Sequence, residues 1–174
     1  MRVVTYGGAS SLDGFIAAAD GSYDWIHHGK GADAIMRDYW KRIDTLVMGR
    51  KTWEVVAGQG GGPGMGSVHS YVFSRTLSRI SRKGVTLVKD DAGDFVRALK
   101  QQPGKDICVF GGGDFARSLF AAGVIDEVGF NIQPVLLGSG VPMLLDPGRH
   151  VSLELMESRT IDGGCVYVTY KVGR

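Results

Sequence analysis

Short runs of apolar residues alternate with amphipathic segments along the first part of the chain. Each apolar run ends in glycine or a polar residue, which is typical of a buried strand. The segments between them carry apolar residues four positions apart, such as Phe95 and Leu99, which is typical of helices. The pattern predicts strands at residues 3–7, 45–49, 68–74, 84–89 and 106–112, and helices at about residues 32–42, 51–57, 92–101 and 114–122.

The pattern changes in the remainder of the chain. Strand-like runs follow one another at residues 124–137, 151–161 and 165–172, and the sequence DGG between the last two is a hairpin turn signal. Alternating strands and helices favour a parallel sheet, whereas successive strands favour antiparallel pairing. The predicted fold class is therefore α/β, with a mostly parallel central sheet, antiparallel C-terminal strands and flanking helices. A length of 174 residues, 44% of them hydrophobic, suits a single domain over residues 1–174.

Composition and charge exclude several classes of function. A formal net charge of +2 gives no field of the kind that non-specific nucleic-acid binding needs. No run of about 18 apolar residues is present, and Met1 leads directly into the strand-like sequence RVVTY. We therefore expect no membrane span and no signal peptide, and we expect a cytoplasmic protein. Cys108 and Cys165 lie in apolar runs, as buried thiols do, and the histidines lack the spacing of metal ligands.

The sequence DTLVMGRKTWE, residues 44–54, leads from an apolar strand through a glycine into a helix start. Helix starts expose unpaired backbone N–H groups. Together with neighbouring cations and a hydroxyl, these groups form a site for an anion, most simply a phosphate. The residues that would form this site are Gly49, Arg50, Lys51 and Thr52.

A second strand end repeats the pairing of a hydroxyl with a cation. Ser74 and Arg75 follow the strand that ends in the sequence VFS. If this strand end lies beside the first one, Ser74 and Arg75 converge with Arg50 and Thr52 on a single phosphate. Such an arrangement would suit the 2′-phosphate of NADPH.

A later strand enters a helix through three glycines, in the sequence ICVFGGGDFARSL. Gly111, Gly113 and Ala116 match the spacing of a dinucleotide fingerprint. An ordinary Rossmann unit has this turn after its first strand and an acidic residue about 20 positions further on. Here the turn comes late in the chain and Asp126 and Glu127 follow it too soon, so that fold is excluded. The glycines still allow a pyrophosphate to approach a helix start; the alternative is a close turn without a ligand.

A loop with two Asp-Gly turns follows the first strand, in the sequence SSLDGFIAAADGSYDW, residues 10–25. The two turns enclose an apolar pair, Phe15 and Ile16. Loops at the carboxyl ends of strands are where α/β sheets bind ligands. An ordinary surface hairpin is the alternative interpretation.

These stretches, in this order, are similar to the dihydrofolate reductase fold. They resemble more closely the stand-alone reductases related to the C-terminal domain of the riboflavin-biosynthesis deaminase-reductase. The resemblance spans nearly the whole chain and is carried by SLDGFIA, DTLVMGRKTWE, VFSRTL, VFGGGDFARSL and IDEVGFNIQPVLLGSGVPML. It implies a three-layer fold, a homodimer, and hydride transfer from NADPH to a pyrimidine- or pterin-like small molecule, as in 5-amino-6-(5-phosphoribosylamino)uracil reductase or dihydrofolate reductase. The zinc-binding deaminase half is absent, so we expect no deamination.

The resemblance also implies a role for each matching residue. The adenosine and its 2′-phosphate would be held by Gly49, Arg50, Lys51, Thr52, Ser74 and Arg75. The pyrophosphate would be lined by Gly111, Gly112, Gly113, Asp114 and Phe115. The nicotinamide would be met by Ile16 and Ala17.

By the same resemblance, the active-site carboxylate falls on Asp33. Such a carboxylate would accept paired hydrogen bonds from an amino-pyrimidine edge and help to deliver a proton. A structural interpretation stays open, because an acid is favoured in the first turn of a helix and Arg37 lies four residues on. Asn131 is a candidate for substrate contact and Trp25 for covering the pocket. The alternative to a reductase is a nucleotide-binding module that binds NADPH without oxidising it.

Overall fold

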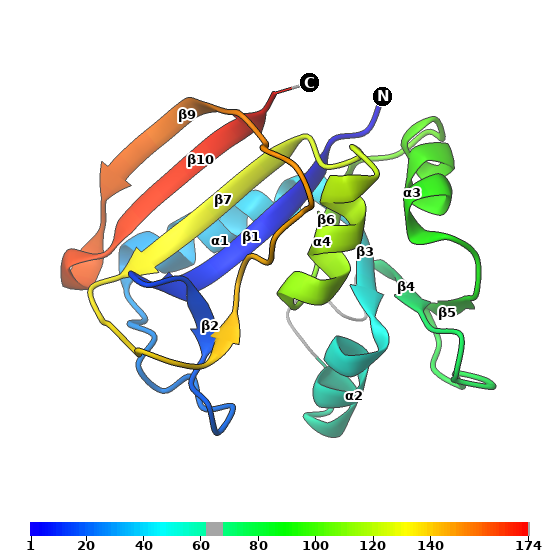
Figure 1. Cartoon of the computed structure of the whole chain (residues 1–174), viewed down its shortest axis with the longest axis horizontal. Helices are drawn as coiled ribbons and strands as arrows, with labels where there is room; N and C mark the ends of the chain where they lie inside the picture. Colours follow the sequence, from blue (N-terminus) through cyan, green and yellow to red (C-terminus); the bar gives the residue numbers. More distant parts are fainter. Residues whose placement is uncertain (62–67, 174) are drawn as a thin grey trace.

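The structure, a computed structural model that describes residues 1–61 and 68–173, is built around an eight-stranded sheet (Figure 1). The strands are β1 (Val4–Ser11), β3 (Ile43–Gly49), β4 (His69–Phe73), β5 (Val85–Val88), β6 (Asp106–Val109), β7 (Glu127–Gln133), β9 (Leu153–Thr160) and β10 (Val166–Val172). Their order is β5-β4-β3-β6-β1-β7-β10-β9. The strands from β5 to β7 pair in parallel, and β10 is antiparallel to both of its neighbours.

In the described part of the chain, four α-helices lie against this sheet. They are α1 (Lys30–Arg42), α2 (Arg50–Gly58), α3 (Ala92–Lys100) and α4 (Gly113–Ala121). In Figure 1, α3 and α4 cover the near face of the sheet, α1 lies behind it, and α2 continues from the end of β3. The helix bounds agree with the predicted ranges to within two residues, because each predicted helix has an apolar side that packs on the sheet.

The hydrophobic core forms two layers, one on each face of the sheet. Alternate residues of β3 divide between them, because successive side chains of a strand point to opposite faces. Val47 packs in the layer under α3 and α4, whereas Leu46 and Met48 pack in the opposite layer with Tyr39 and Trp40 of α1. All three β3 side chains are fully buried, and each contributes about 1.5–3 kcal/mol to folding by its removal from water.

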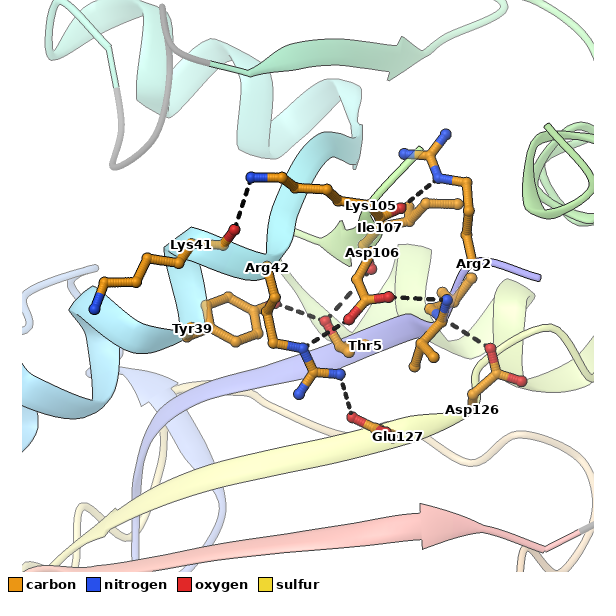
Figure 2. Close-up of polar contacts among 12 residues, drawn as sticks. Arg2, Thr5, Tyr39, Lys41, Arg42, Lys105, Asp106, Ile107, Asp126 and Glu127 are labelled. Atoms are coloured by element: carbon orange, nitrogen blue, oxygen red, sulfur yellow. Dashed lines mark hydrogen bonds and ion pairs between the residues drawn. The ribbon is translucent and has the colours of Figure 1, made fainter. Parts of the chain in front are cut away.

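A polar network fixes the C-terminal end of α1 at the amino edge of the parallel strands (Figure 2). The guanidinium of Arg42 donates to Asp106 Oδ2 at 2.6 Å and to Glu127 Oε2 at 2.9 Å, which ties the helix to β6 and β7. Nearby, Lys105 Nζ donates to the carbonyl oxygen of Lys41 at 2.9 Å. The start of α1 is therefore directed toward the opposite edge, where the parallel strands end.

Four predicted element boundaries were wrong. The first strand, predicted at residues 3–7, extends to Ser11 as β1. The loop predicted after β1 contains a strand, β2 (Phe15–Ala17), which pairs with β8 (Val141–Pro142) in a separate two-stranded sheet. The strand predicted at residues 124–137 extends only over β7, because Pro134 has no N–H group for the ladder. The strand predicted to reach residue 112 ends at Val109, two residues before Gly111, whose φ of +123° is incompatible with a strand.

Candidate cofactor and substrate site

The structure brings together the two glycine-containing strand ends that the sequence singled out. β3 and β6 are parallel neighbours, so the turns that follow them lie side by side at the carboxyl edge of the sheet. A Cβ atom placed on Gly49 would lie 3.4 Å from Cβ of Phe115, in ordinary contact. Lys51 Nζ lies 3.6 Å from Asp114 Oδ2 across the two helix starts. Gly49 and Lys51 therefore adjoin the residues predicted to line a pyrophosphate.

The three glycines of the second turn differ in their surroundings. At Gly111, an added Cβ would overlap Thr52 Oγ1, so only glycine fits there. At Gly113, the first residue of α4, an added Cβ would lie 3.0 Å from the carbonyl oxygen of Pro142. At Gly112, by contrast, no described atom lies within 4 Å of an added Cβ. As far as the described residues go, the turn thus leaves open space beside a helix start, where backbone N–H groups attract an anion.

The second hydroxyl and cation pair lies beside the first. The last residues of β3 and β4 are register partners, so Ser74 follows its strand at the level where Arg50 follows the other. Ser74 Oγ accepts the N–H of Leu77 at 3.0 Å, which fixes the turn, and Arg75 is exposed. Arg50 Nη1 donates to Glu54 Oε1 at 2.7 Å within α2. The strand ends are therefore neighbours, and the guanidinium of Arg50 already has one acidic partner.

The loop after β1 reaches the glycine turn through the small sheet. Ile16 packs against the core layer that α4 covers, and Ala17 pairs with Val141 of β8. The next residue of β8, Pro142, places its carbonyl oxygen against Gly113. Ile16 and Ala17 are thereby held on the same side of the sheet as the start of α4.

Asp13, which the sequence indicated only as a turn residue, joins two loops. Its carboxylate accepts the hydroxyl of Ser11 at 2.6 Å and the N–H groups of Leu137 and Gly138 at 3.2 and 2.7 Å. The hydrogen bond from Ser11, followed by those from the two backbone groups, lowers the pKa of Asp13 below its ordinary value despite an opposing desolvation effect. The loops that carry β2 and β8 are thus connected at their base.

Asp33 lies in the first turn of α1, as predicted, and is exposed. A surface hollow of about 580 Å³ runs along this helix, lined by Asp33, Met36, Arg37, Trp40 and Lys41. No ion pair joins Asp33 to Arg37. The hollow is shallow, and its lining combines two apolar side chains with one carboxylate and two cations.

The other two residues predicted to contact the substrate, Asn131 and Trp25, are not among the residues that line this hollow. Asn131 occupies β7 between Ala9 of β1 and Tyr167 of β10. Its Oδ1 atom is buried and, in the described part of the chain, has no hydrogen-bond partner. A buried acceptor of this kind requires a donor from water or a ligand. Trp25 is half-buried, and its indole N–H donates to the carbonyl oxygen of Ser22 at 3.3 Å.

Over residues 1–61 and 68–173, no three His, Cys, Asp or Glu side chains are grouped so that they could hold a metal ion. Cys108 and Cys165 are free and buried, as their apolar surroundings in the sequence indicated. Within the same residues, no helix has the length and apolar character needed to cross a membrane.

The sheet order and the paired strand-to-helix turns define a protein with the dihydrofolate reductase-like fold. Dihydrofolate reductase from Enterococcus faecalis, complexed with NADP(H) and RAB-propyl, matches with a TM-score of 0.69 and 19% identity, covering 99% of this chain and 97% of that protein. The deaminase/5-amino-6-(5-phosphoribosylamino)uracil reductase of Thermotoga maritima matches with a TM-score of 0.71 and 16% identity, covering 98% of this chain and 56% of that one. At these identities the likeness shows the fold.

The sequence comparison narrows the assignment further. The family described as the RibD C-terminal domain matches residues 2–167, and the chain belongs to this family. YyaP of Bacillus subtilis strain 168, an uncharacterized protein, is 33% identical over 173 residues, covering 93% of this chain and 90% of that protein. A structure from Shewanella sp. PV-4, provisionally assigned to riboflavin biosynthesis, matches with a TM-score of 0.84 and 27% identity over 99% of this chain and 100% of that one.

Proposed function

We propose that the protein is an NADPH-dependent reductase that transfers hydride to a pyrimidine- or pterin-like small molecule. The observation that carries the proposal is the open space in front of Gly112, beside the two strand ends that present Arg50 and Arg75. Phosphates of one dinucleotide would occupy these neighbouring helix and strand ends. The family and the dihydrofolate reductase-like fold support the same reaction class.

The residues around these strand ends would bind NADPH by charge and close backbone approach. The set that would hold the adenosine and its 2′-phosphate is Gly49, Arg50, Lys51, Thr52, Ser74 and Arg75. The set that would line the pyrophosphate is Gly111, Gly112, Gly113, Asp114 and Phe115. Ile16 and Ala17 would contact the nicotinamide. When bound, the cofactor supplies the hydride, and the protein supplies binding, orientation and electrostatics.

The Asp33 carboxylate, in the first turn of α1, would accept two hydrogen bonds from an amino-pyrimidine edge of the substrate ring. In this role Asp33 holds the ring and helps to deliver the proton that accompanies hydride. The unpartnered Asn131 Oδ1 would accept a further N–H group, and Trp25 would cover the pocket.

A module that binds NADPH without oxidising it is the second candidate. The observation in its favour is that the described residues lining the hollow all belong to α1, so they do not enclose a substrate by themselves. Both candidates predict cofactor binding. They differ in whether NADPH is consumed when dihydrofolate or a ribityl-aminopyrimidine is added.

We also propose that the protein is a homodimer, joined through the β9 edge of the sheet. All eight residues of β9 are exposed, and Leu153, Leu155 and Met156 each leave about half of their surface in water. In Figure 1 no helix covers β9 and β10 on the side that α4 occupies. An exposed edge strand with apolar side chains favours association with another chain. Light scattering during size-exclusion chromatography measures the oligomeric state, and a monomeric mass at micromolar concentration would contradict this part of the proposal.

Titration of the purified protein with NADPH and with NADH tests the cofactor assignment. Nicotinamide fluorescence gives the Kd, and the melting temperature shows whether binding stabilises the folded state. Arg50→Ala and Arg75→Ala should weaken NADPH by roughly tenfold or more and leave NADH nearly unchanged, because each removes about 1.5–3 kcal/mol of charge-assisted hydrogen bonding to the 2′-phosphate.

Arg97→Ala is a matched control, because Arg97 is an exposed arginine on α3 whose partners are Asp94 and the carbonyl oxygen of Ala122. It should leave both Kd values unchanged. If the Arg50 and Arg75 variants lost affinity for NADPH and for NADH equally, the assignment of these residues to the 2′-phosphate would be refuted. No binding of either cofactor to the wild-type protein would remove the reductase proposal as a whole.

A further inference from the structure

The turn of the C-terminal hairpin contacts the start of α1. Gly29, the residue before the helix, has no side chain that could accept a backbone N–H group. Asp162, in the short turn Asp162–Gly164 between β9 and β10, takes this role: its Oδ2 atom accepts the N–H of Gly31 at 2.6 Å. The first turn of α1 is therefore capped by a carboxylate that lies 131 residues further along the chain.

The close approach of the two segments depends on glycines on both sides. A Cβ atom on Gly29 would lie 2.7 Å from Cβ of Asp162, and one on Gly31 would lie 3.3 Å from Cβ of Ile161. On the turn, Gly163 has a φ of +73° and faces the ring of His27 so closely that a Cβ atom there would overlap it. The close contact therefore depends on glycine both at the start of α1 and in the hairpin turn.

A buried glutamine side chain accepts hydrogen bonds from both segments of this contact. Gln133 of β7 is fully buried, and its Oε1 atom accepts the backbone N–H of His27 at 2.8 Å. The thiol of Cys165 donates to the same oxygen at 3.3 Å, and the carbonyl oxygen of Cys165 accepts the N–H of Ile161 at 2.9 Å. The segment that enters α1 and the hairpin turn are therefore held by one buried side chain.

We infer that Asp162 is a positioning residue for the Asp33 carboxylate, an inference that rests on the proposed reductase function. Asp33 lies two residues beyond the capped Gly31, and its own N–H donates to the carbonyl oxygen of Gly29 at 2.9 Å, in the same turn of the helix. Without an acceptor for the Gly31 N–H, this turn frays. A carboxylate displaced by about 1 Å loses much of its effect on a reaction. Asp162 acts through the helix backbone.

Two variants of Asp162 and one matched control test the inference. Asp162→Ala removes the acceptor, Asp162→Asn keeps an oxygen that can accept the same N–H, and Asp91→Ala removes the cap of α3, where Asp91 Oδ1 accepts the N–H of Asp94 at 3.0 Å. Hydrogen exchange measured by mass spectrometry reports the opening of residues 30–36. Steady-state kinetics with NADPH and either dihydrofolate or a ribityl-aminopyrimidine gives kcat and KM, and fluorescence gives the Kd of NADPH.

Asp162→Ala should accelerate amide exchange at residues 30–36 by roughly five- to tenfold, as expected for a lost cap. It should lower kcat by roughly tenfold while the Kd of NADPH stays within about twofold, because the cofactor would bind at other strand ends. Asp162→Asn should restore both quantities. Asp91→Ala should leave kcat and the exchange of residues 30–36 at wild-type values.

If the amides of residues 30–36 exchanged in Asp162→Ala at the same rate as in the wild type, the capping role would be overturned. Faster exchange with an unchanged kcat would overturn the positioning role. Loss of kcat in Asp162→Asn equal to that in Asp162→Ala would also overturn it, since the asparagine preserves the cap. A wild-type protein that binds no NADPH, or binds it and reduces neither substrate, refutes the proposed function instead. The exchange experiment needs no cofactor and separates these failures.

Discussion

Substitution of Gly112 by valine removes cofactor binding in a protein that still folds, if the glycine turn holds a pyrophosphate. Gly112 has φ and ψ of −75° and 165°, an extended conformation that β-branched residues adopt readily. No described atom lies within 4 Å of an added Cβ, so valine meets no clash with the described residues. The free energy of unfolding should change by no more than about 0.5 kcal/mol, as for a surface substitution.

The effect on binding is much larger. A branched side chain at Gly112 would fill the space in front of the N–H groups that begin α4, those of Gly113 and Asp114. A hydrogen bond from such a group to a charged phosphate contributes about 1.5–3 kcal/mol, so the loss of two removes about 3–6 kcal/mol. Since 1.4 kcal/mol corresponds to a tenfold change, the Kd of NADPH should rise by at least roughly 100-fold.

Fluorescence titration with NADPH, combined with urea unfolding of the same preparation, separates the two effects. Gly112→Ala, with a smaller side chain, should give an intermediate Kd. Gly58→Val is a matched control, because Gly58 at the end of α2 also has no described atom within 4 Å of an added Cβ. A Gly112→Val variant that binds NADPH as tightly as the wild type would refute the pyrophosphate assignment and leave the turn as a mere connection.

Asp33→Asn should lower kcat by roughly 100-fold with little change in NADPH affinity, and full activity would make Asp33 a helix-start residue only. Arg42→Ala breaks two half-exposed ion pairs, so urea unfolding should show that the free energy of unfolding falls by about 1 kcal/mol. A loss of binding free energy for NADPH that exceeds this loss of unfolding free energy would contradict a purely structural role for Arg42. Burial raises the pKa of Cys108 to about 12, so a thiol reagent at pH 8 should modify it only as fast as the protein unfolds. The pKa of Asp13 is lowered in the folded state, so the ionised carboxylate stabilises the fold at neutral pH. This stabilisation is lost as the pH falls through the folded-state pKa. The melting temperatures of Asp13→Asn and of the wild type should therefore converge in acid.

The helices and most strands could be predicted because their apolar patterns are long enough to carry a period. Phe95 and Leu99 mark the side of α3 that packs on the sheet, and the predicted range differs from the helix by one residue. The small sheet of β2 and β8 could not be predicted. Its strands have three and two residues, too few to show alternation, and they pair Phe15 with Pro142 from distant parts of the chain.

The candidate site, like the fold, could be predicted from the sequence only in part. That the ends of β3 and β4 lie side by side could be predicted, because parallel strands bring their carboxyl ends to one edge of the sheet. The contacts of Asp13 with Gly138 and of Asp162 with Gly31 could not. In each case a side chain bonds a backbone N–H group, which every residue except proline possesses, so no residue pattern identifies the partner.

The central position of β1 governs when the fold can be completed during synthesis. Val4 pairs with Ile107, and Thr5 pairs with Glu127, so the first strand to leave the ribosome waits for partners made more than 100 residues later. β3, β4 and β5, which are sequence neighbours, can pair meanwhile. Such long-range pairing slows folding and leaves the apolar nascent chain exposed to aggregation. A ribosome stalled before β6 should therefore carry a chain that is a substrate for chaperones and proteases, and translation rate should influence the yield of active protein.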